Sequence, residues 1–189
     1  MTLTHIIPSL RRTMPDPMDR DRWPEFTTTS VDDVTTAGVS MVRLVDWCGS
    51  PAIHTAAAVI PFSGGKPSED ELVSIVVTRV IAVDRPDERT QDVWVDADLR
   101  DCRPVVGQAR LIGRSSTAHD TLTRLHPADA RFNEASLPHL PADVHPGDLI
   151  VFPCEGTVRL DQVDPNRRRP PIASATRDDQ PGPLPFCGR

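Results

Sequence analysis

The sequence lacks the features that mark membrane, secreted and zinc-binding proteins. No apolar run approaches the length of about eighteen residues that a transmembrane helix needs. No basic leader precedes a long apolar stretch, so we expect synthesis in the cytoplasm without a secretory signal. No C-x-x-C pair occurs, which argues against zinc ribbons and fingers. The cysteines are Cys48, Cys102, Cys154 and Cys187, and we expect their thiols to be reduced. If the protein leaves the cell, a disulfide can form, but the sequence does not assign its pairing.

Lysine and tyrosine are also nearly absent. Lys66 stands alone beside twenty arginines, and there is no tyrosine. Arg, Ala, Pro, Gly and Val have GC-rich codons, so this usage favours a GC-rich genome, such as that of an actinobacterium or of a virus infecting one. Hydrophobic residues make up 38 % of the 189, which is enough for the core of one domain.

Proline is concentrated at the two ends of the chain. Residues 1–30 and 164–189 hold ten of the twenty prolines, and each one fixes φ and removes a backbone donor. These ends also carry spaced apolar side chains, which an extended segment can hide only against its own body or a neighbour. We predict that they dock on a neighbour, and for Trp23 packing on its own body is the alternative. The predicted apolar anchors are Ile6, Ile7, Leu10, Met14, Trp23, Phe26, Leu184 and Phe186.

Charge separates the ends from the middle. Residues 1–22 carry a net charge of +1, residues 165–189 carry +3, and residues 23–164 carry −10. An acidic body repels phosphates, so direct, sequence-specific nucleic-acid binding is not expected. The basic tail, with Arg167, Arg168 and Arg169, either docks on the acidic body of the next copy or is simply solvated.

The pattern of the middle predicts a mainly β (α+β) body, barrel-like or with a curved antiparallel sheet, and two or three short helices. Leu72–Val83 is dense in β-branched residues and indicates a central strand covered on both faces. Val39–Cys48 has helical periodicity, with Ser40 as its cap. The predicted domains are an extended arm at 1–24, a β-rich body at 25–163 and an extended arm rich in proline and arginine at 164–189. Other expected elements are strands at 25–31, 52–60, 91–97, 105–112, 149–153 and 157–163, helices at 115–125 and 127–135, and loops at 62–68 and 137–146.

Chemical sites are weakly indicated. Cys48 with His54 could supply a nucleophile and a base, but no nucleophile motif surrounds them. Asp96, Asp98 and Asp101 could offer oxygen ligands, yet the calcium-loop pattern is missing, and a solvated acidic turn is the preferred interpretation. We therefore predict no catalytic residue, no cofactor and no metal. A small actinobacterial enzyme or metal-binding protein that uses these residues is the alternative.

Three stretches resemble those of small virion proteins encoded among the structural genes of phages that infect actinobacteria. They are residues 9–17 (SLRRTMPDP), 37–51 (AGVSMVRLVDWCGSP) and 146–154 (PGDLIVFPC). The resemblance implies a structural role in the virion without catalytic residues: a minor tail or tail-tip protein first, and a head–tail connector or capsid-associated protein second. The implied partners are copies of the chain and other virion proteins, with no membrane.

Overall fold

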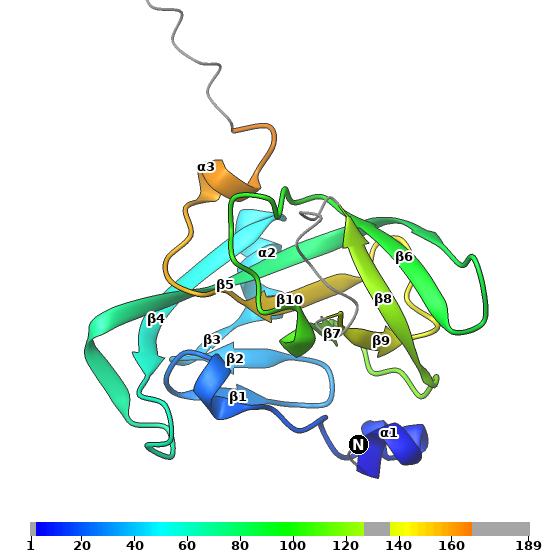
Figure 1. Ribbon diagram of the computed structural model, residues 1–189, viewed down its shortest axis with the longest axis horizontal. Helices are drawn as coiled ribbons and strands as arrows, with labels where there is room; N and C mark the ends of the chain where they lie inside the picture. Colours follow the sequence, from blue (N-terminus) through cyan, green and yellow to red (C-terminus); the bar gives the residue numbers. More distant parts are fainter. Residues whose placement is uncertain (1–2, 127–136, 168–189) are drawn as a thin grey trace, which may run out of the picture.

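The computed structural model describes residues 3–126 and 137–167, and within them the protein is mainly β and barrel-like (Figure 1). The strand order of the main sheet is β7-β10-β5-β6-β8-β9, and β4 pairs with β5 beside this path. Its strands are β4 (Ala52–Val59), β5 (Pro67–Asp84), β6 (Thr90–Val95), β7 (Arg110–Ile112), β8 (Asp120–His126), β9 (His139–Pro141) and β10 (Leu149–Pro153).

Strand β5 organises the sheet, as its run of β-branched residues predicts. It pairs antiparallel with β4 and β10 over its first and middle parts, then with β6 near its end. Its residues 74–78 are all buried, which is typical of a strand covered on both faces. The register shifts between Val80 and Ala82, where β5 passes from one set of partners to the other.

The sheet curves until its two end strands, β7 and β9, lie against each other. Strands β6 and β8 pair in parallel, while the other pairs of the main sheet are antiparallel. The interior is filled by apolar side chains from around this nearly closed barrel, which accounts for its cohesion. They include Val76, Val80, Val93, Val95, Leu125, Leu140, Ile150 and Phe152.

A smaller layer packs on one side of the barrel. It consists of β1 (Thr27–Thr29), β2 (Val34–Thr36), β3 (Val39–Ser40) and the helix α2 (Met41–Cys48). The Ser40 hydroxyl accepts a hydrogen bond from the Arg43 amide at 3.1 Å, so the predicted cap and helix are confirmed. Residues of this layer and of the barrel share a second core, with Val34, Met41, Val45, Ile75, Val77 and Val151 among its members.

Several local predictions are wrong. The predicted helix at 115–125 is instead a bend followed by β8, in which Thr121, Thr123 and Leu125 alternate inward. The predicted strand at 157–163 does not form, since residues 157–159 have no regular structure and the short helix α3 (Leu160–Val163) follows them. The strand expected at 105–112 splits into the 3₁₀ turn η3 (Val106–Gln108) and β7, and β9 occupies part of the loop expected at 137–146. The helix predicted at 127–135 falls outside the described residues.

The N-terminal segment forms short helical turns on the surface of the body (Figure 1). These are α1 (Leu3–Ile6), η1 (Pro8–Arg12) and η2 (Arg20–Arg22). Prolines among them prevent a longer helix, but the helical turns differ from the extended arm that the sequence predicts. In the described part of the chain, no helix combines the length and the apolar character that crossing a membrane requires.

Candidate functional site

Arg11 fixes the N-terminal segment to the body. The Arg11 side chain is only 6 % exposed, forms an ion pair with Asp120 of β8 and donates to the Ala118 carbonyl at 3.1 Å. Its Nε also donates to Asp16 at 3.2 Å. Burial alone would lower the pKa of this guanidinium, but the hydrogen bonds and charges of Asp120 and Asp16 raise it above its ordinary value. A buried arginine with these partners is a structural clamp.

Arg110, on β7, holds the next part of the same segment. Its guanidinium donates to the carbonyl oxygens of Asp16, at 2.7 Å, and of Pro17. The Arg110 Nε is buried without a hydrogen-bond partner, and burial lowers the pKa of the side chain. Contacts of Arg11 and Arg110 therefore hold residues 11–17 against the body from two sides.

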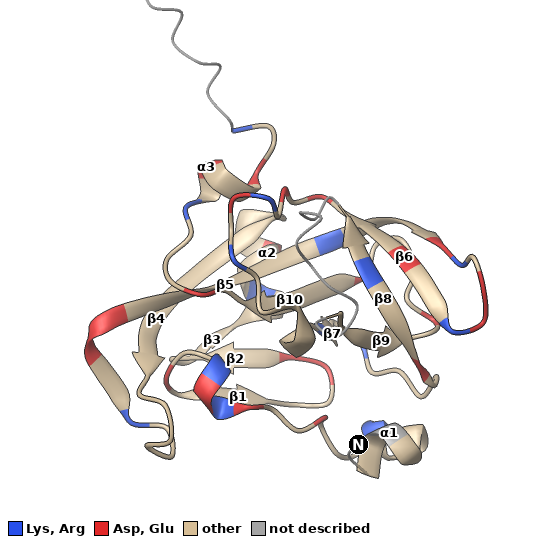
Figure 2. Ribbon diagram, in the orientation of Figure 1, with Lys and Arg blue, Asp and Glu red and all other residues tan. Residues whose placement is uncertain are grey.

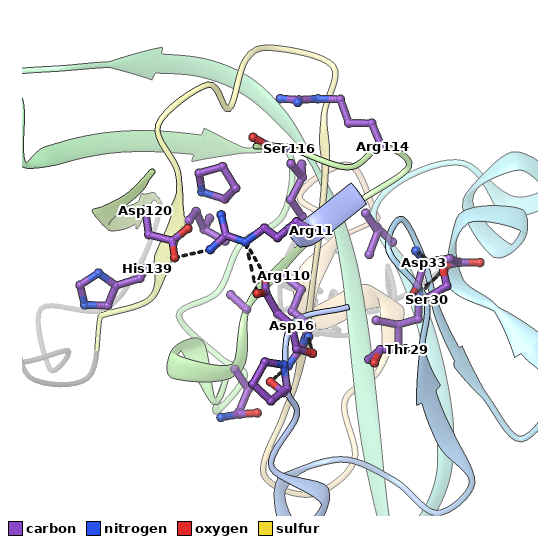
Figure 3. A pocket seen from close by; sticks show the side chains of 18 of the residues that line it. Arg11, Asp16, Thr29, Ser30, Asp33, Arg110, Arg114, Ser116, Asp120 and His139 are labelled. Atoms are coloured by element: carbon purple, nitrogen blue, oxygen red, sulfur yellow. Dashed lines mark hydrogen bonds and ion pairs between the residues drawn. The ribbon is translucent and has the colours of Figure 1, made fainter. Parts of the chain in front are cut away.

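A pocket of about 270 Å³ lies beside Arg11 and Arg110, where β7 and β9 meet (Figure 3). The N-terminal segment, the β1–β2 loop and residues of β7 and β9 line it. Its charged side chains balance in number, so the pocket has no excess charge with which to attract a strongly ionic ligand. They are Arg11, Arg110 and Arg114 against Asp16, Asp33 and Asp120.

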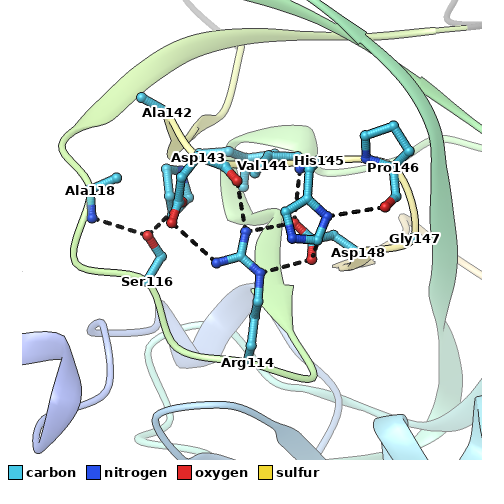
Figure 4. A network of polar contacts seen from close by, with 12 residues as sticks. Arg114, Ser116, Ala118, Ala142, Asp143, Val144, His145, Pro146, Gly147 and Asp148 are labelled. Carbon is cyan, nitrogen blue, oxygen red and sulfur yellow. Dashed lines mark hydrogen bonds and ion pairs between the residues drawn. The ribbon is translucent and has the colours of Figure 1, made fainter.

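Arg114, which also lines the pocket, forms a second clamp (Figure 4). It donates to both carboxylate oxygens of Asp148, at 2.8 and 2.7 Å, and to the Asp143 carbonyl at 2.8 Å. The hydrogen bond with Asp148 is the main cause that raises the pKa of Arg114. Burial alone would raise the pKa of Asp143, but hydrogen bonds from Ser116, at 2.6 Å, and Arg114 lower it. This network holds the loop that leads into β10.

The structure does not bring the predicted chemical residues together as a site. Cys48 is exposed at the end of α2, whereas His54 lies on β4 in register with Ile75. Burial lowers the pKa of His54, and its Nε2 has no hydrogen-bond partner. No hydrogen bond joins Cys48 to His54 among the described residues, so the geometry of a nucleophile with its base is absent there.

The aspartates after β6 have structural partners. Asp96 accepts hydrogen bonds from the Ser50 hydroxyl and, at 2.9 Å, from the Arg79 amide. Asp98 is buried and forms an ion pair with Arg100 at 2.7 Å. Across residues 3–126 and 137–167, no group of three or more His, Cys, Asp or Glu side chains is arranged to hold a metal ion.

Trp23 packs in its own body, which differs from the prediction that it anchors a neighbouring chain. It is only 1 % exposed and belongs to the second core of its own body, as the alternative had it. Its indole Nε1 donates to the Gln108 side chain at 3.2 Å, and Met18 packs against the same core. Packing on its own body is favoured because the second core surrounds the indole with apolar side chains, and Gln108 of η3 supplies an acceptor.

The other predicted anchors differ in their surroundings. Leu10 is half-buried, and Arg167 forms an ion pair with Asp164 at 3.3 Å. Arg168, Arg169, Leu184 and Phe186 lie outside the described residues. Four predicted anchors are exposed and thus free to contact a partner: Ile6, Ile7, Met14 and Phe26.

Phe26 and Phe62 form the most unusual part of the surface. They are 72 % and 96 % exposed, and their backbones have φ values of 50° and 61°. Bulky residues rarely adopt this left-handed conformation, and it costs them on the order of 1–3 kcal/mol. The sequence indicated Phe26 through its place in the proline-rich N-terminal end, but it gave no sign of Phe62, whose segment was expected to be an ordinary loop.

Two hydrogen bonds join the segments that carry these two phenylalanines. The Phe62 amide donates to Asp21 at 2.9 Å, and the Glu25 amide donates to the Ala57 carbonyl of β4 at 2.9 Å. Ile60, at the end of β4, is also exposed. We call Phe26, Ile60 and Phe62 the hairpin patch.

Comparison with known proteins identifies no family. No protein-family model matches the chain, and no curated protein matches it. Among solved structures, it is similar to the arginine decarboxylase of Paramecium bursaria Chlorella virus, both in its X-ray crystal structure and in the one bound to agmatine. In each case the identity is 16 %, the TM-score is 0.30, and the match covers 44 % of this chain and 24 % of the decarboxylase chain. Such a low TM-score does not define a shared fold, and no functional conclusion follows from it.

Proposed function

We propose that the protein is a structural component of the virion of a phage that infects actinobacteria, a minor tail or tail-tip protein first and a connector or capsid-associated protein second. It works by assembling with copies of itself and with other virion proteins. The observation that carries the assembly role is the hairpin patch, in which two exposed phenylalanines are held in a strained backbone conformation.

The energetics of these two residues favour a docking role. A phenylalanine that faces water contributes no burial to its own fold, yet each of these two adds strain. Docking on a partner would bury the rings and release about 25 cal/mol for each Å² of apolar surface removed from water. Aromatic side chains on a rigid support also lose little entropy on binding, which makes them effective anchors.

The shape and charge of the hairpin favour a second copy of this chain as the partner. The end of the β4–β5 hairpin extends to one side of the body and carries exposed acidic residues (Figure 2). These are Glu69, Asp70 and Glu71, whereas the sequence from Arg167 to the C-terminus is basic. Opposite charges on two separate parts of one chain are complementary between successive copies, and they orient the contact.

A photo-cross-linking experiment tests the assembly role. Benzoylphenylalanine replaces Phe62 in the full chain, and a control variant carries it at Glu88, an exposed residue beyond the opposite end of β5. We expect irradiation to produce covalent dimers and larger species from position 62 only, with cross-linked peptides from this same chain. Equal cross-linking from both positions, or none from position 62, would contradict the proposal.

The virion assignment has a separate test. Particles released from cells that carry the gene are purified on a density gradient, and their proteins are identified by mass spectrometry. We expect the chain to co-sediment with the particles at constant stoichiometry. If the chain cross-links to itself but is absent from the particles, the assembly role stands and the virion assignment is wrong.

A further inference from the structure

Two buried cysteines, distant in the sequence, meet in the core of the barrel. Cys102 lies between β6 and η3, and Cys154 directly follows β10. Both belong to the main core, and each thiol influences the ionisation of the other. The Cys102 sulfur is also 3.4 Å from the Leu99 carbonyl oxygen, to which it donates.

The backbone fixes this meeting from both sides. Pro104 and Cys154 form an isolated antiparallel bridge. The Val105 amide donates to the Pro153 carbonyl at 2.8 Å, and the Glu155 amide donates to the Arg103 carbonyl at 2.8 Å. The segments that carry the two thiols are thus held side by side by main-chain hydrogen bonds, so the contact does not depend on the side chains alone.

We propose that Cys102 and Cys154 are a built disulfide site, oxidised by a low-molecular-weight disulfide such as glutathione disulfide. The Cys102 thiolate attacks one sulfur of the oxidant, which forms a mixed disulfide and releases one glutathione thiolate. The Cys154 thiolate then attacks the Cys102 sulfur and displaces the second glutathione. The protein gives up two electrons and two protons, and one glutathione disulfide becomes two glutathione molecules.

Exposure and environment set this order, since Cys102 is 7 % exposed and therefore easier for the oxidant to reach than Cys154, which is 2 % exposed. The hydrogen bond from Cys154 lowers the pKa of Cys102, whereas the hydrogen bond to Cys102, together with burial, raises the pKa of Cys154. Thiolate is the attacking form, so Cys102 is the better first nucleophile. Cys154 becomes the attacking group once Cys102 carries the mixed disulfide, because the backbone bridge holds the segments of the two residues side by side.

The site suits a protein that is made in a reducing cytoplasm and then leaves it. Inside the cell both thiols stay reduced, and outside it the bond ties the loop after β6 to the end of β10. This inference does not rest on the assembly role, since any passage into an oxidising compartment would close the bond. It assigns the pairing that the cysteine spacing left open.

The test uses the full chain with Cys48→Ser and Cys187→Ser, so that Cys102 and Cys154 are the remaining thiols. The protein is incubated with excess glutathione disulfide, and its intact mass and its free thiols in guanidinium chloride are measured. We expect a mass lower by two hydrogen atoms, no bound glutathione, no remaining free thiol, and full reversal by dithiothreitol.

Two further variants in this background test the order of attack. Cys154→Ser should accumulate one glutathione on Cys102, and Cys102→Ser should acquire glutathione at least tenfold more slowly. The proposal of a built site is overturned if the parent protein retains both thiols or carries stable glutathione adducts. The proposed order is overturned if both single variants are modified at the same rate.

Discussion

Replacing Trp23 with alanine should destabilise the body itself, because the structure makes this residue part of the core rather than an anchor on a neighbour. Trp23 is 1 % exposed, and a buried tryptophan covers roughly 150–250 Å². At about 25 cal/mol per Å², the loss of this burial costs about 4–6 kcal/mol before the surroundings relax. Measured substitutions of this kind cost about 3–5 kcal/mol, and we expect about 4 kcal/mol.

The hydrogen bond of Trp23 adds little to this value. Its acceptor, the Gln108 Oε1, also accepts from the Asp19 amide at 3.3 Å and therefore keeps a partner when the indole is removed. With a urea m-value of about 2 kcal/mol/M, a loss of 4 kcal/mol lowers the denaturation midpoint by about 2 M. The matched control is Trp47→Ala, since Trp47 is 76 % exposed on α2 and its loss should change stability by less than about 0.5 kcal/mol.

Urea denaturation followed by far-ultraviolet circular dichroism measures both variants against the parent. If Trp23→Ala shifts the midpoint no more than Trp47→Ala does, Trp23 is not part of the folded body. In that case the original expectation, that the N-terminal segment serves a neighbouring chain, regains its strength.

Three other predictions follow from the clamp, the buried imidazole and the strained loop. Arg11→Met should lower the free energy of unfolding by about 3 kcal/mol because it breaks the largely buried ion pair with Asp120. Arg12→Met, at an exposed neighbour, should change it little in the same urea assay. Burial holds the pKa of His54 below its ordinary value, so the free energy of unfolding should fall as the pH drops from about 6.5 through the folded-state pKa. Urea midpoints measured between about pH 7.5 and 5 should therefore depend less on pH in His54→Gln than in the parent. Phe62→Asn should raise the free energy of unfolding by about 1 kcal/mol, since asparagine tolerates the left-handed backbone, whereas Phe62→Ala should give no such gain; a loss of stability in Phe62→Asn would contradict the assigned strain.

The parts of the fold that depend on local signals were predictable from the sequence. The continuous β-branched run of β5 and the Ser40 cap of α2 both specify their elements within a few residues. Strand β8 escaped prediction because its inward residues include two threonines. Thr123 is tolerated inside because the Gln91 side chain donates to it at 2.9 Å, and this partner is distant in the sequence.

The contacts of the N-terminal segment and the hairpin patch were harder to predict, because they depend on residues that are distant in the sequence. The placement of Trp23 depends on Gln108, and that of Arg11 depends on Asp120, so neither partner is visible in a local pattern. A positive φ at Phe62 likewise leaves no mark in the sequence, because glycines nearby already account for a turn. Composition indicated that apolar residues near the N-terminus matter, but only the three-dimensional contacts separate Trp23, which is buried, from Phe26, which is exposed.

Sedimentation velocity over a range of concentrations tests the assembly role most directly, with the parent protein and the Phe26→Asn/Phe62→Asn variant side by side. We predict that the parent forms species larger than the 20.8 kDa chain as its concentration rises, while the variant remains a folded monomer. A parent that sediments as a monomer at every concentration, with the same profile as the variant, would contradict the account.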